Sequence, residues 1–418
     1  MALVVQKYGG SSVADAARIK NVAGRIAASS EEGNQVVVVV SAMGDTTDRL
    51  IELVYQVTER PDVREFDTLL STGELVSSTL LAMTLKEMGY SAISLSGAQA
   101  GIKTDSAHSR ARIREVESMR VTRELEKGNI VIVAGFQGVT DEMDVTTLGR
   151  GGSDTTAVAL AASLGAGQCQ IYTDVDGVYT ADPSLIPEAR PMPEIGYDEM
   201  LELATYGTRV MHSRAVELGE LYDIPILVKS SFSYGPGTLI HGGVSSDMEV
   251  RNKVRGVAYD LNVAKITVTG VSDKPGIASS IFQPLASAGI SVDTIVQNVG
   301  TDRVTDLTFT VAKSDLDGAM RVVEPIAKSV RAKECIGGTG LGKVSVVGTG
   351  MQNTPGYAAR MFEVLSREGI NIQMISTSEI RITCIINESE VKAAVKALHR
   401  AFELEVEDEE TGAKGSGS

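Results

Sequence analysis

The sequence predicts an α/β protein in two parts: a layered fold with a mostly parallel sheet over residues 1–245, followed by two small domains of one repeated pattern. In the first part, β-branched runs alternate with stretches of helical period, as in "QVVVVVSAM" (35–43) and then "DRLIELVYQVTER" (48–60). Such alternation is typical of parallel α/β layers. In the second part, residues 273–293 and 353–373 align without gaps at an offset of 80.

Each repeat follows a strand and precedes two more strands and a helix, which predicts β-α-β-β-α-β twice. The predicted domains are 263–335 and 343–405, and the strand 250–262 is expected to pack with the second. "GGTGLGKV" (337–344) fits the phosphate-loop pattern GxxxxGK but has valine in place of Ser/Thr, so we interpret it as a linker. The acidic and then Gly/Ser-rich end, 406–418, is predicted to be a disordered tail.

Composition narrows the class of protein. The 418 residues are 43% hydrophobic and 22% charged, with a net charge of -15, which argues against a sequence-independent nucleic-acid binder. Cys169, Cys335 and Cys384 lie far apart, so neither a disulfide framework nor a protein-bound metal site is predicted. The uninterrupted apolar runs, such as 36–40, are too short to span a bilayer and no export signal is recognised. We expect a cytoplasmic protein without a membrane role.

The first strand ends in "KYGGSS" (7–12). A phosphate site needs backbone N–H groups at close range and a cation, and Gly9, Gly10 and Lys7 supply both. The alternative is a plain turn, which is the commoner use of Gly-Gly.

Three further polar turns follow predicted strands: 40–48 with Ser41 and Thr47, 146–160, and 172–183. Because the carboxyl ends of parallel strands meet at one edge of a sheet, we expect a single crevice there. In the second turn Ser153 or Asp154 also reads as a helix N-cap. Both interpretations hold together, since a helix N-terminus is itself an anion site.

These stretches resemble the aspartate kinases, which belong to the amino-acid kinase family and carry tandem ACT domains. The motifs that carry the resemblance are "KYGGSS" (7–12), "VSAMGDTTD" (40–48), "STGELVSS" (71–78), "GFQGVT" (135–140), "TTLGRGGSDTTA" (146–157), "YTDVDGVYTADP" (172–183) and "STSEIRI" (376–382). The resemblance implies a three-layer αβα sandwich, the amino-acid kinase fold, plus two ferredoxin-like ACT domains. It also implies ATP- and Mg²⁺-dependent phosphorylation of the β-carboxylate of L-aspartate, the first step towards lysine, threonine and methionine.

The same resemblance assigns roles to residues. Lys7, Gly9 and Gly10 would hold the transferring phosphate with Ser41 nearby, and Lys7, Arg150 and Asp154 would be the catalytic set. Glu74 would pair with the substrate ammonium and Arg150 with its α-carboxylate. The other implied residues are Thr47, Ser153 and Asp154 at the reacting end of the substrate, and Thr173, Asp174, Tyr179, Asp182 and Arg209 around the nucleotide.

Regulation is implied by the ACT pair. The resemblance suggests feedback inhibition by lysine, threonine or both, with Asp273, Gly276, Gln297 and Asn298 as candidate effector residues. The alternative is that Pro-Gly merely starts a packing helix. Pairing of ACT domains would make a homo-oligomer, and Met248 would serve as an internal start for a separate regulatory subunit, as occurs in part of the family.

Three positions depart from the family pattern: Ser184 replaces a common Arg or Lys, Ser291 a common Asn, and Gln373 a common Glu. Ser184 would remove a cation that faces the nucleotide phosphates, and Ser291 and Gln373 would alter the preference for the effector. A different class, a catalytically inactive amino-acid sensor, is the alternative to an enzyme. The presence of Lys7, Glu74, Arg150, Asp154 and Asp174 together speaks against it.

Overall fold

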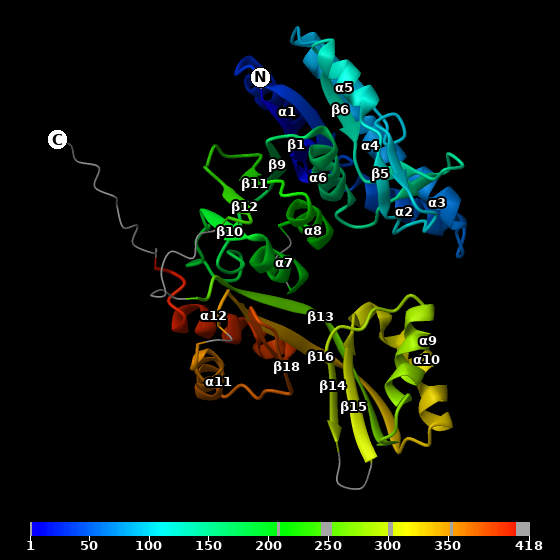
Figure 1. Ribbon diagram of the computed structural model, residues 1–418, viewed down its shortest axis with the longest axis vertical. Coiled ribbons are helices and arrows are strands. Elements are labelled where there is room, and N and C mark those ends of the chain that lie inside the picture. Colours follow the sequence, from blue (N-terminus) through cyan, green and yellow to red (C-terminus); the bar gives the residue numbers. More distant parts are fainter. Residues whose placement is uncertain (1, 207–209, 244–252, 300–303, 352–353, 407–418) are drawn as a thin grey trace, which may run out of the picture. The chain divides into compact units, whose positions relative to one another are not determined.

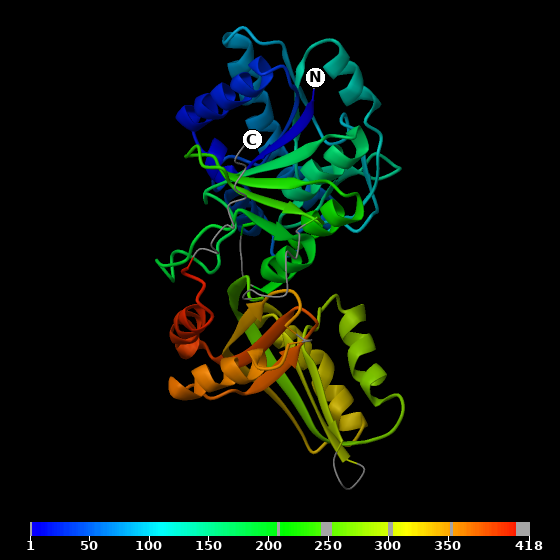
Figure 2. The same ribbon diagram turned by 60° about the vertical axis from the view of Figure 1, so that its left-hand side comes forward.

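The computed structural model describes residues 2–206, 210–243, 253–299, 304–351 and 354–406. The chain divides into two compact units. We call them the amino-terminal unit (1–179 and 191–250) and the carboxy-terminal unit (180–190 and 251–418) and describe each by itself (Figures 1 and 2).

An eight-stranded sheet forms the centre of the amino-terminal unit, and all neighbouring strands are parallel except β11 and β12. The strand order is β10 (Glu194–Gly196), β12 (Thr238–His241), β11 (Ile226–Ser230), β9 (Gln168–Thr173), β1 (Leu3–Tyr8), β2 (Gln35–Val40), β6 (Ile130–Ala134) and β3 (Ala92–Leu95).

Helices cover both faces of this sheet and complete the three layers. On one face, α1 (Ala16–Glu31) and α4 (Thr72–Glu87) bury apolar side chains against Tyr8, Val38 and Ile132. On the other, α6 (Gly152–Leu164) packs on β1, β2 and β9 and on α8 (Ser213–Leu221). Because successive side chains of a strand alternate between faces, Lys7 points to the α6 face while Tyr8 points to the α1 face.

The remaining elements of this unit surround the sheet. A smaller four-stranded sheet has the order β5 (Ile113–Val116), β4 (Ile102–Thr104), β7 (Gln137–Val139) and β8 (Val145–Thr147). The other helices are η1 (Gly10–Val13), α2 (Thr46–Val57), α3 (Val63–Leu70), α5 (Met119–Glu126) and α7 (Tyr197–Tyr206). Helix α3 lies against β8, so it connects the small sheet to α4, which follows it directly.

One described helical stretch, Val63–Glu87 (α3 and α4), is long and apolar enough to cross a membrane. Half of its apolar window is buried inside the protein, and α4 packs on β3 and β6. It also carries the buried Glu74. These features are those of a core helix.

The carboxy-terminal unit is built on one antiparallel sheet of six strands that both repeats share. The order is β14 (Ile295–Val299), β15 (Val304–Val311), β13 (Gly256–Ser272), β16 (Glu334–Val347), β18 (Arg381–Asn387) and β17 (Met374–Thr377). Helices α9 (Ile277–Ser287) and α10 (Leu316–Ser329) cover the half with β14 and β15, and α11 (Tyr357–Arg367) and α12 (Val391–Ala401) cover the other half (Figure 1). Single 3₁₀ turns, η2 (Lys313–Asp315) and η3 (Glu388–Glu390), precede α10 and α12.

The interpretation of 337–344 as a linker is wrong, because these residues lie within β16. The first part of β16 pairs with 263–269 and its last part, 343–347, with 256–260. The glycines are explained by close packing of helices on the strand. A Cβ at Gly337 would meet Met320 Sδ of α10 at 3.0 Å, and one at Gly342 would meet Val391 Cγ2 of α12 at 2.4 Å.

The segment 180–190 lies within the predicted first domain, 1–245, but in the structure it belongs to the carboxy-terminal unit. Ala181 and Ile186 are each 1% exposed within the core of the second repeat. The Thr180 hydroxyl lies 2.9 Å from His399 Nε2, and the Val257 N–H donates to the Thr180 carbonyl at 2.8 Å. Apolar burial therefore assigns this segment to the second repeat.

Candidate active site

A buried ion pair stands at the carboxyl end of the central strand. Lys7 Nζ lies 2.6 Å from Asp154 Oδ1, and the two side chains are only 11% and 10% exposed. Lys7 comes from the end of β1, and Asp154 from the first turn of α6. The alternation along β1 and the start of α6 thus bring a cation and an anion together at a helix N-terminus.

The Gly-rich turn after β1 packs closely against the turn after β2. A Cβ at Gly10 would meet the Ala42 carbonyl oxygen at 2.9 Å, so this close approach requires glycine. The Gly44 N–H donates to the Gly10 carbonyl at 3.0 Å, and the Gly9 N–H to the Tyr172 carbonyl of β9 at 3.2 Å. The turns after β1 and β2 and the end of β9 therefore lie together at one edge of the sheet, as the sequence predicted.

Helix α6 begins through a left-handed residue, Gly151, with φ +69°. A Cβ at Gly151 would meet Cβ of His212 at 2.1 Å, so any side chain would displace the start of α8. The N–H groups of Gly152 and Asp154 already donate to the carbonyls of Gly149 and Gly151, so it is the dipole at the start of α6 that favours an anion there.

These residues surround a cleft of about 830 Å³. The predicted residues that line it are Lys7, Gly10, Ser41, Thr47, Glu74, Arg150, Ser153 and Asp154. The structure thus brings together all of the predicted substrate residues and most of those predicted to hold the transferring phosphate.

Glu74 is the most deeply buried carboxyl group of the cleft, with 3% of the residue exposed. Its Oε1 accepts a hydrogen bond from the Ala42 N–H at 3.3 Å, and Oε2 has no hydrogen-bond partner among the described residues. Burial raises the pKa of Glu74 to about 8. A buried carboxyl oxygen that lacks a partner is a candidate for contact with a cationic ligand.

Three arginines in the cleft were not found from the sequence: Arg110, Arg112 and Arg214. Arg214 donates from Nη1 to the Leu148 carbonyl at 2.7 Å and from Nη2 to the Ala111 carbonyl at 3.1 Å. For Arg110 and Arg112 the only sequence signal was the alternation of arginines in "SRARIR" (109–114), a pattern that is also typical of an exposed strand. With Arg150 they surround the cleft with positive charge.

The predicted nucleotide residues are divided between the two units. Thr173 is the last residue of β9, Asp174 and Tyr179 follow it, and the Thr173 hydroxyl donates to Asp174 Oδ1 at 3.1 Å. Asp182 instead belongs to the carboxy-terminal unit, where it accepts from the Ser184 N–H at 2.9 Å and from the Tyr259 hydroxyl at 3.0 Å. The nucleotide-binding role of Asp182 stays a prediction. Arg209 and Met248 lie outside the described residues.

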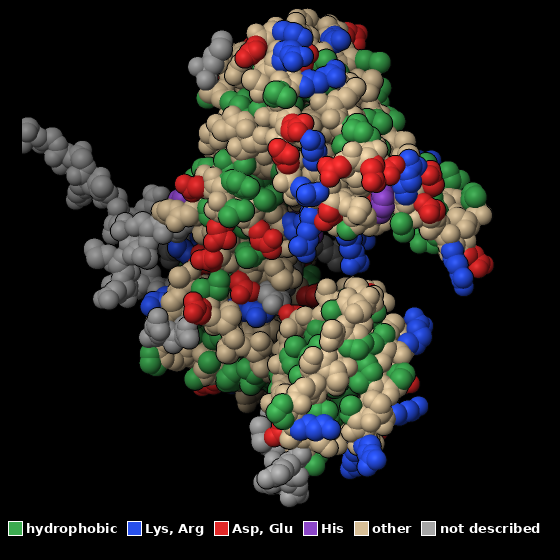
Figure 3. All heavy atoms as spheres, turned by 45° about the vertical axis from the view of Figure 1, so that its right-hand side comes forward, with side chains coloured by type: hydrophobic (Ala, Val, Ile, Leu, Met, Phe, Trp, Pro, Cys, Tyr) green, Lys and Arg blue, Asp and Glu red, His purple; other side chains and the backbone are tan. Residues whose placement is uncertain are grey.

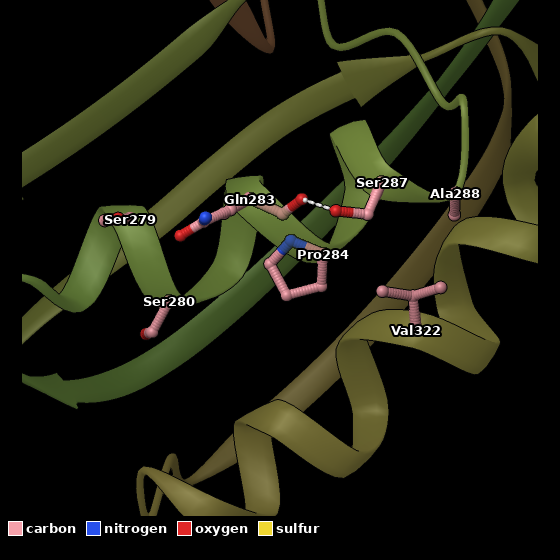
Figure 4. A pocket seen from close by; sticks show the side chains of 7 residues that line it. All are labelled: Ser279, Ser280, Gln283, Pro284, Ser287, Ala288 and Val322. Carbon is pink, nitrogen blue, oxygen red and sulfur yellow. Dashed lines mark hydrogen bonds between the residues drawn. The ribbon is translucent and has the colours of Figure 1, made fainter.

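The candidate effector residues lie in the first repeat. Asp273 and Gly276 are in the exposed turn between β13 and α9, and Gly276 caps α9 with φ +95°. Gln297 and Asn298 belong to β14, an outer strand of the six-stranded sheet. A separate shallow hollow between α9 and α10, shown in Figure 4, is lined by Ser279, Ser280, Gln283, Pro284, Ser287, Ala288 and Val322. It offers no charged side chain for an ionic ligand.

Charges of both signs are interspersed on the face shown in Figure 3, without one continuous basic area there. The cations that an anionic substrate needs are instead supplied locally by the cleft, as the net charge of -15 led us to expect.

The fold and the cleft together define a phosphotransferase of small anionic substrates, joined to a regulatory pair of repeats. The chain matches the model of the amino acid kinase family over residues 2–230 and that of the ACT domain over 266–325 and 344–402.

Named relatives specify the class further. An aspartate kinase of Stutzerimonas stutzeri is 50% identical over 405 residues, 97% of this chain and 98% of that protein. An aspartokinase of Corynebacterium glutamicum is 50% identical over 421 residues, the whole of both chains. The crystal structure of E. coli aspartokinase III in complex with aspartate and ADP has a TM-score of 0.81 at 26% identity, covering 96% of this chain and 99% of that one. This chain belongs to the amino acid kinase family, among the aspartate kinases that carry ACT domains.

Proposed function

We propose that this protein transfers the γ-phosphoryl group of ATP to the β-carboxylate of L-aspartate, giving 4-phospho-L-aspartate, and that the cleft around Lys7 and Asp154 is where it does so. The observation that carries the proposal is the buried Lys7–Asp154 pair at the N-terminus of α6, inside a cleft that also contains Glu74 and Arg150. The nucleophile of this reaction is already ionised at neutral pH, so no general base is required.

Lys7 is proposed to neutralise the migrating phosphoryl group. Phosphoryl transfer leaves little covalent work for the protein, so the rate depends on in-line positioning and on positive charge that is already in place. Asp154, 2.6 Å away, fixes the direction of the ammonium before substrate arrives. Gly9, Gly10 and Ser41 keep the adjoining backbone close to the phosphate path.

Each charged group of the substrate is proposed to bind a side chain of the opposite charge. Arg150 is proposed to bind the α-carboxylate of aspartate with two parallel hydrogen bonds, which its planar guanidinium permits. Glu74 is proposed to receive the ammonium through its unpartnered Oε2. Thr47, Ser153 and Asp154 then surround the reacting carboxylate.

The nucleotide is proposed to bind beside the end of β9, near Thr173, Asp174 and Tyr179, with Arg209 as a further candidate. Mg²⁺ fits this cleft, since Mg²⁺ in such sites is held by one or two carboxylates together with phosphate oxygens and water. Asp154 is the carboxylate we assign to it. The described residues contain no group of three or more His, Cys, Asp or Glu that would form an all-protein cage. Bound Mg²⁺ would neutralise phosphate charge.

The carboxy-terminal unit is proposed to regulate this activity. E. coli aspartokinase III has been solved in complex with lysine and aspartate, at 26% identity and a TM-score of 0.72 to this chain. We propose lysine, threonine or both as effectors at Asp273, Gly276, Gln297 and Asn298, and a homo-oligomer formed through the ACT domains. An internally initiated subunit from Met248 and a cytoplasmic location remain predictions.

Hydroxylamine trapping tests the function, because an acyl phosphate reacts with hydroxylamine to give a hydroxamate. The purified chain with ATP, Mg²⁺ and L-aspartate is expected to form aspartyl hydroxamate, and added lysine or threonine to reduce the rate. Absence of hydroxamate with every Mg²⁺ and aspartate concentration tried, together with retained effector binding, would instead identify an inactive amino-acid sensor.

A further inference from the structure

Asp67, which no motif singled out, is a completely buried acidic residue of α3 that the function above does not use. It is 0% exposed. Its Oδ2 accepts from the N–H groups of Ser109 and Thr147, each at 2.8 Å, and its Oδ1 accepts from the Thr147 hydroxyl at 2.7 Å. The Ser109 hydroxyl and His108 Nδ1 lie 3.3 Å from Oδ1 and Oδ2, respectively.

The two segments that Asp67 joins both line the cleft. One contains Ser109, Arg110 and Arg112, and the other runs from Thr147 to Arg150. The Ala111 N–H also donates to the Thr147 carbonyl at 2.9 Å. Arg214, described above, joins the same two segments through its bonds to the Leu148 and Ala111 carbonyls. A carboxylate that accepts from N–H groups and a guanidinium that donates to carbonyls therefore fix this pair of loops together.

Ser109 shows that the arrangement has a conformational cost. Its φ is +66°, in the left-handed region that non-glycine residues rarely occupy. Such a backbone persists only where the surroundings hold it. Asp67 does so, because it accepts from the Ser109 N–H and lies within reach of its hydroxyl. The turn at Ser109 sets the direction of the chain immediately before Arg110.

We propose that Asp67 is a positioning residue for substrate recognition: it holds the loops 109–112 and 147–150 so that their arginines are arranged for the anionic amino-acid substrate. The inference rests on the proposed function, which it deepens by adding a determinant of aspartate affinity. Asp67 itself does not line the cleft, so it acts through these loops. The Lys7–Asp154 pair comes from β1 and α6, and neither residue has a described hydrogen bond to Asp67.

The hydrogen-bond geometry predicts which substitutions are tolerated. The partners of Oδ2 include two backbone N–H groups, which can only donate, whereas those of Oδ1 are hydroxyls, which can also accept. Asparagine therefore fits with its oxygen in the place of Oδ2 and its NH₂ towards the hydroxyls. Alanine leaves both N–H groups without a partner.

The experiment compares Asp67→Ala and Asp67→Asn in the full chain by steady-state kinetics and thermal melting. Asp67→Ala is expected to raise the aspartate KM by at least about tenfold, because the two loops that carry the arginines lose the acceptor that holds them. The ATP KM is expected to stay within about twofold. Asp67→Asn is expected to restore the aspartate KM to within about threefold of the unchanged enzyme. Glu124→Ala is the matched control, because Glu124 of α5 is also a buried, hydrogen-bonded carboxylate but lies outside the cleft.

The possible outcomes distinguish a failure of the proposed function from a failure of the positioning role of Asp67. If the unchanged enzyme forms no aspartyl hydroxamate, the proposed function fails. If it is active but Asp67→Ala alters only kcat and melting temperature, or raises both KM values equally, Asp67 has a merely structural role and the inference is overturned. Should Asp67→Ala not fold, Thr147→Val removes one hydroxyl donor and nearly preserves shape. An aspartate KM unchanged in that variant would equally overturn the inference.

Discussion

The raised pKa of Glu74 makes a quantitative prediction about how substrate affinity depends on pH. If only the ionised carboxyl receives the aspartate ammonium, the apparent KM is the limiting KM multiplied by one plus the ratio of neutral to ionised enzyme. With a pKa of about 8, about one-tenth of Glu74 is ionised at pH 7 and half at pH 8. The aspartate KM should therefore fall about fivefold between pH 7 and pH 8.

The assay is the hydroxamate reaction at several aspartate concentrations and saturating ATP, run at pH 7 and pH 8 on the unchanged enzyme and on Glu74→Gln. Glutamine keeps the shape but has no charge to titrate, so its aspartate KM should be high at both pH values. Any titration of the substrate itself is common to both proteins and cancels in the ratio of their KM values.

Stability gives a check that needs no substrate. Glu74 titrates near 4.5 when unfolded and about 8 when folded, so between these pH values the unfolded chain binds fewer protons than the folded one. The free energy of unfolding therefore falls as pH rises through this window. The loss is on the order of 5 kcal/mol once the pH is well above 8, and Glu74→Gln should lack it. A melting temperature that declines equally in both proteins, with the same KM ratio at pH 7 and 8, would refute the reasoning.

Three further substitutions test the cleft. Lys7→Ala should lower kcat by a factor of at least about one hundred, corresponding to about 3 kcal/mol of barrier, and a normal turnover would contradict its role. Arg150→Lys should raise the aspartate KM but leave the ATP KM unchanged, because a point charge cannot replace a bidentate contact. An unaltered aspartate KM would count against that assignment. Gly10→Ala would place a Cβ 2.9 Å from the Ala42 carbonyl, so both kcat and melting temperature should fall, whereas retained activity would show that the turn can move.

Much of the fold was predictable because its determinants are local and periodic. Alternating strands and helices specified the parallel α/β layers, and the two copies of one pattern specified the ACT pair. The error at 337–344 has a physical cause. Gly337 and Gly342 suggested a linker, but they are glycines because α10 and α12 pack closely on β16. A packing requirement between elements far apart in sequence leaves the same local signal as a flexible connection.

The site was predictable where chemistry coincides with the ends of strands. Lys7 near the end of β1 and Ser41 directly after β2 belong to neighbouring strands of one sheet, so topology alone brings them to one edge. The turn before Asp154 follows β8 of the smaller sheet, and it reaches the same cleft because α6 packs on β1 and β2. Arg214 and Asp67 act differently. They hold backbone groups of other loops, and an isolated arginine or aspartate in a helix carries no mark of such long-range hydrogen bonds.

The motif 172–183 shows how far such reasoning extends. As a sequence it reads as one polar stretch at the end of a strand, and the resemblance assigns Thr173, Asp174, Tyr179 and Asp182 to the nucleotide. In the structure Tyr179 pairs with Pro191 in the amino-terminal unit, while the next residue begins the segment of the other unit. Ala181 and Ile186 lie in the core of the second repeat. These two side chains are buried in an apolar core that a repeat far along the chain supplies. One contiguous motif therefore contains residues of two units, and the core that each residue joins determines its unit.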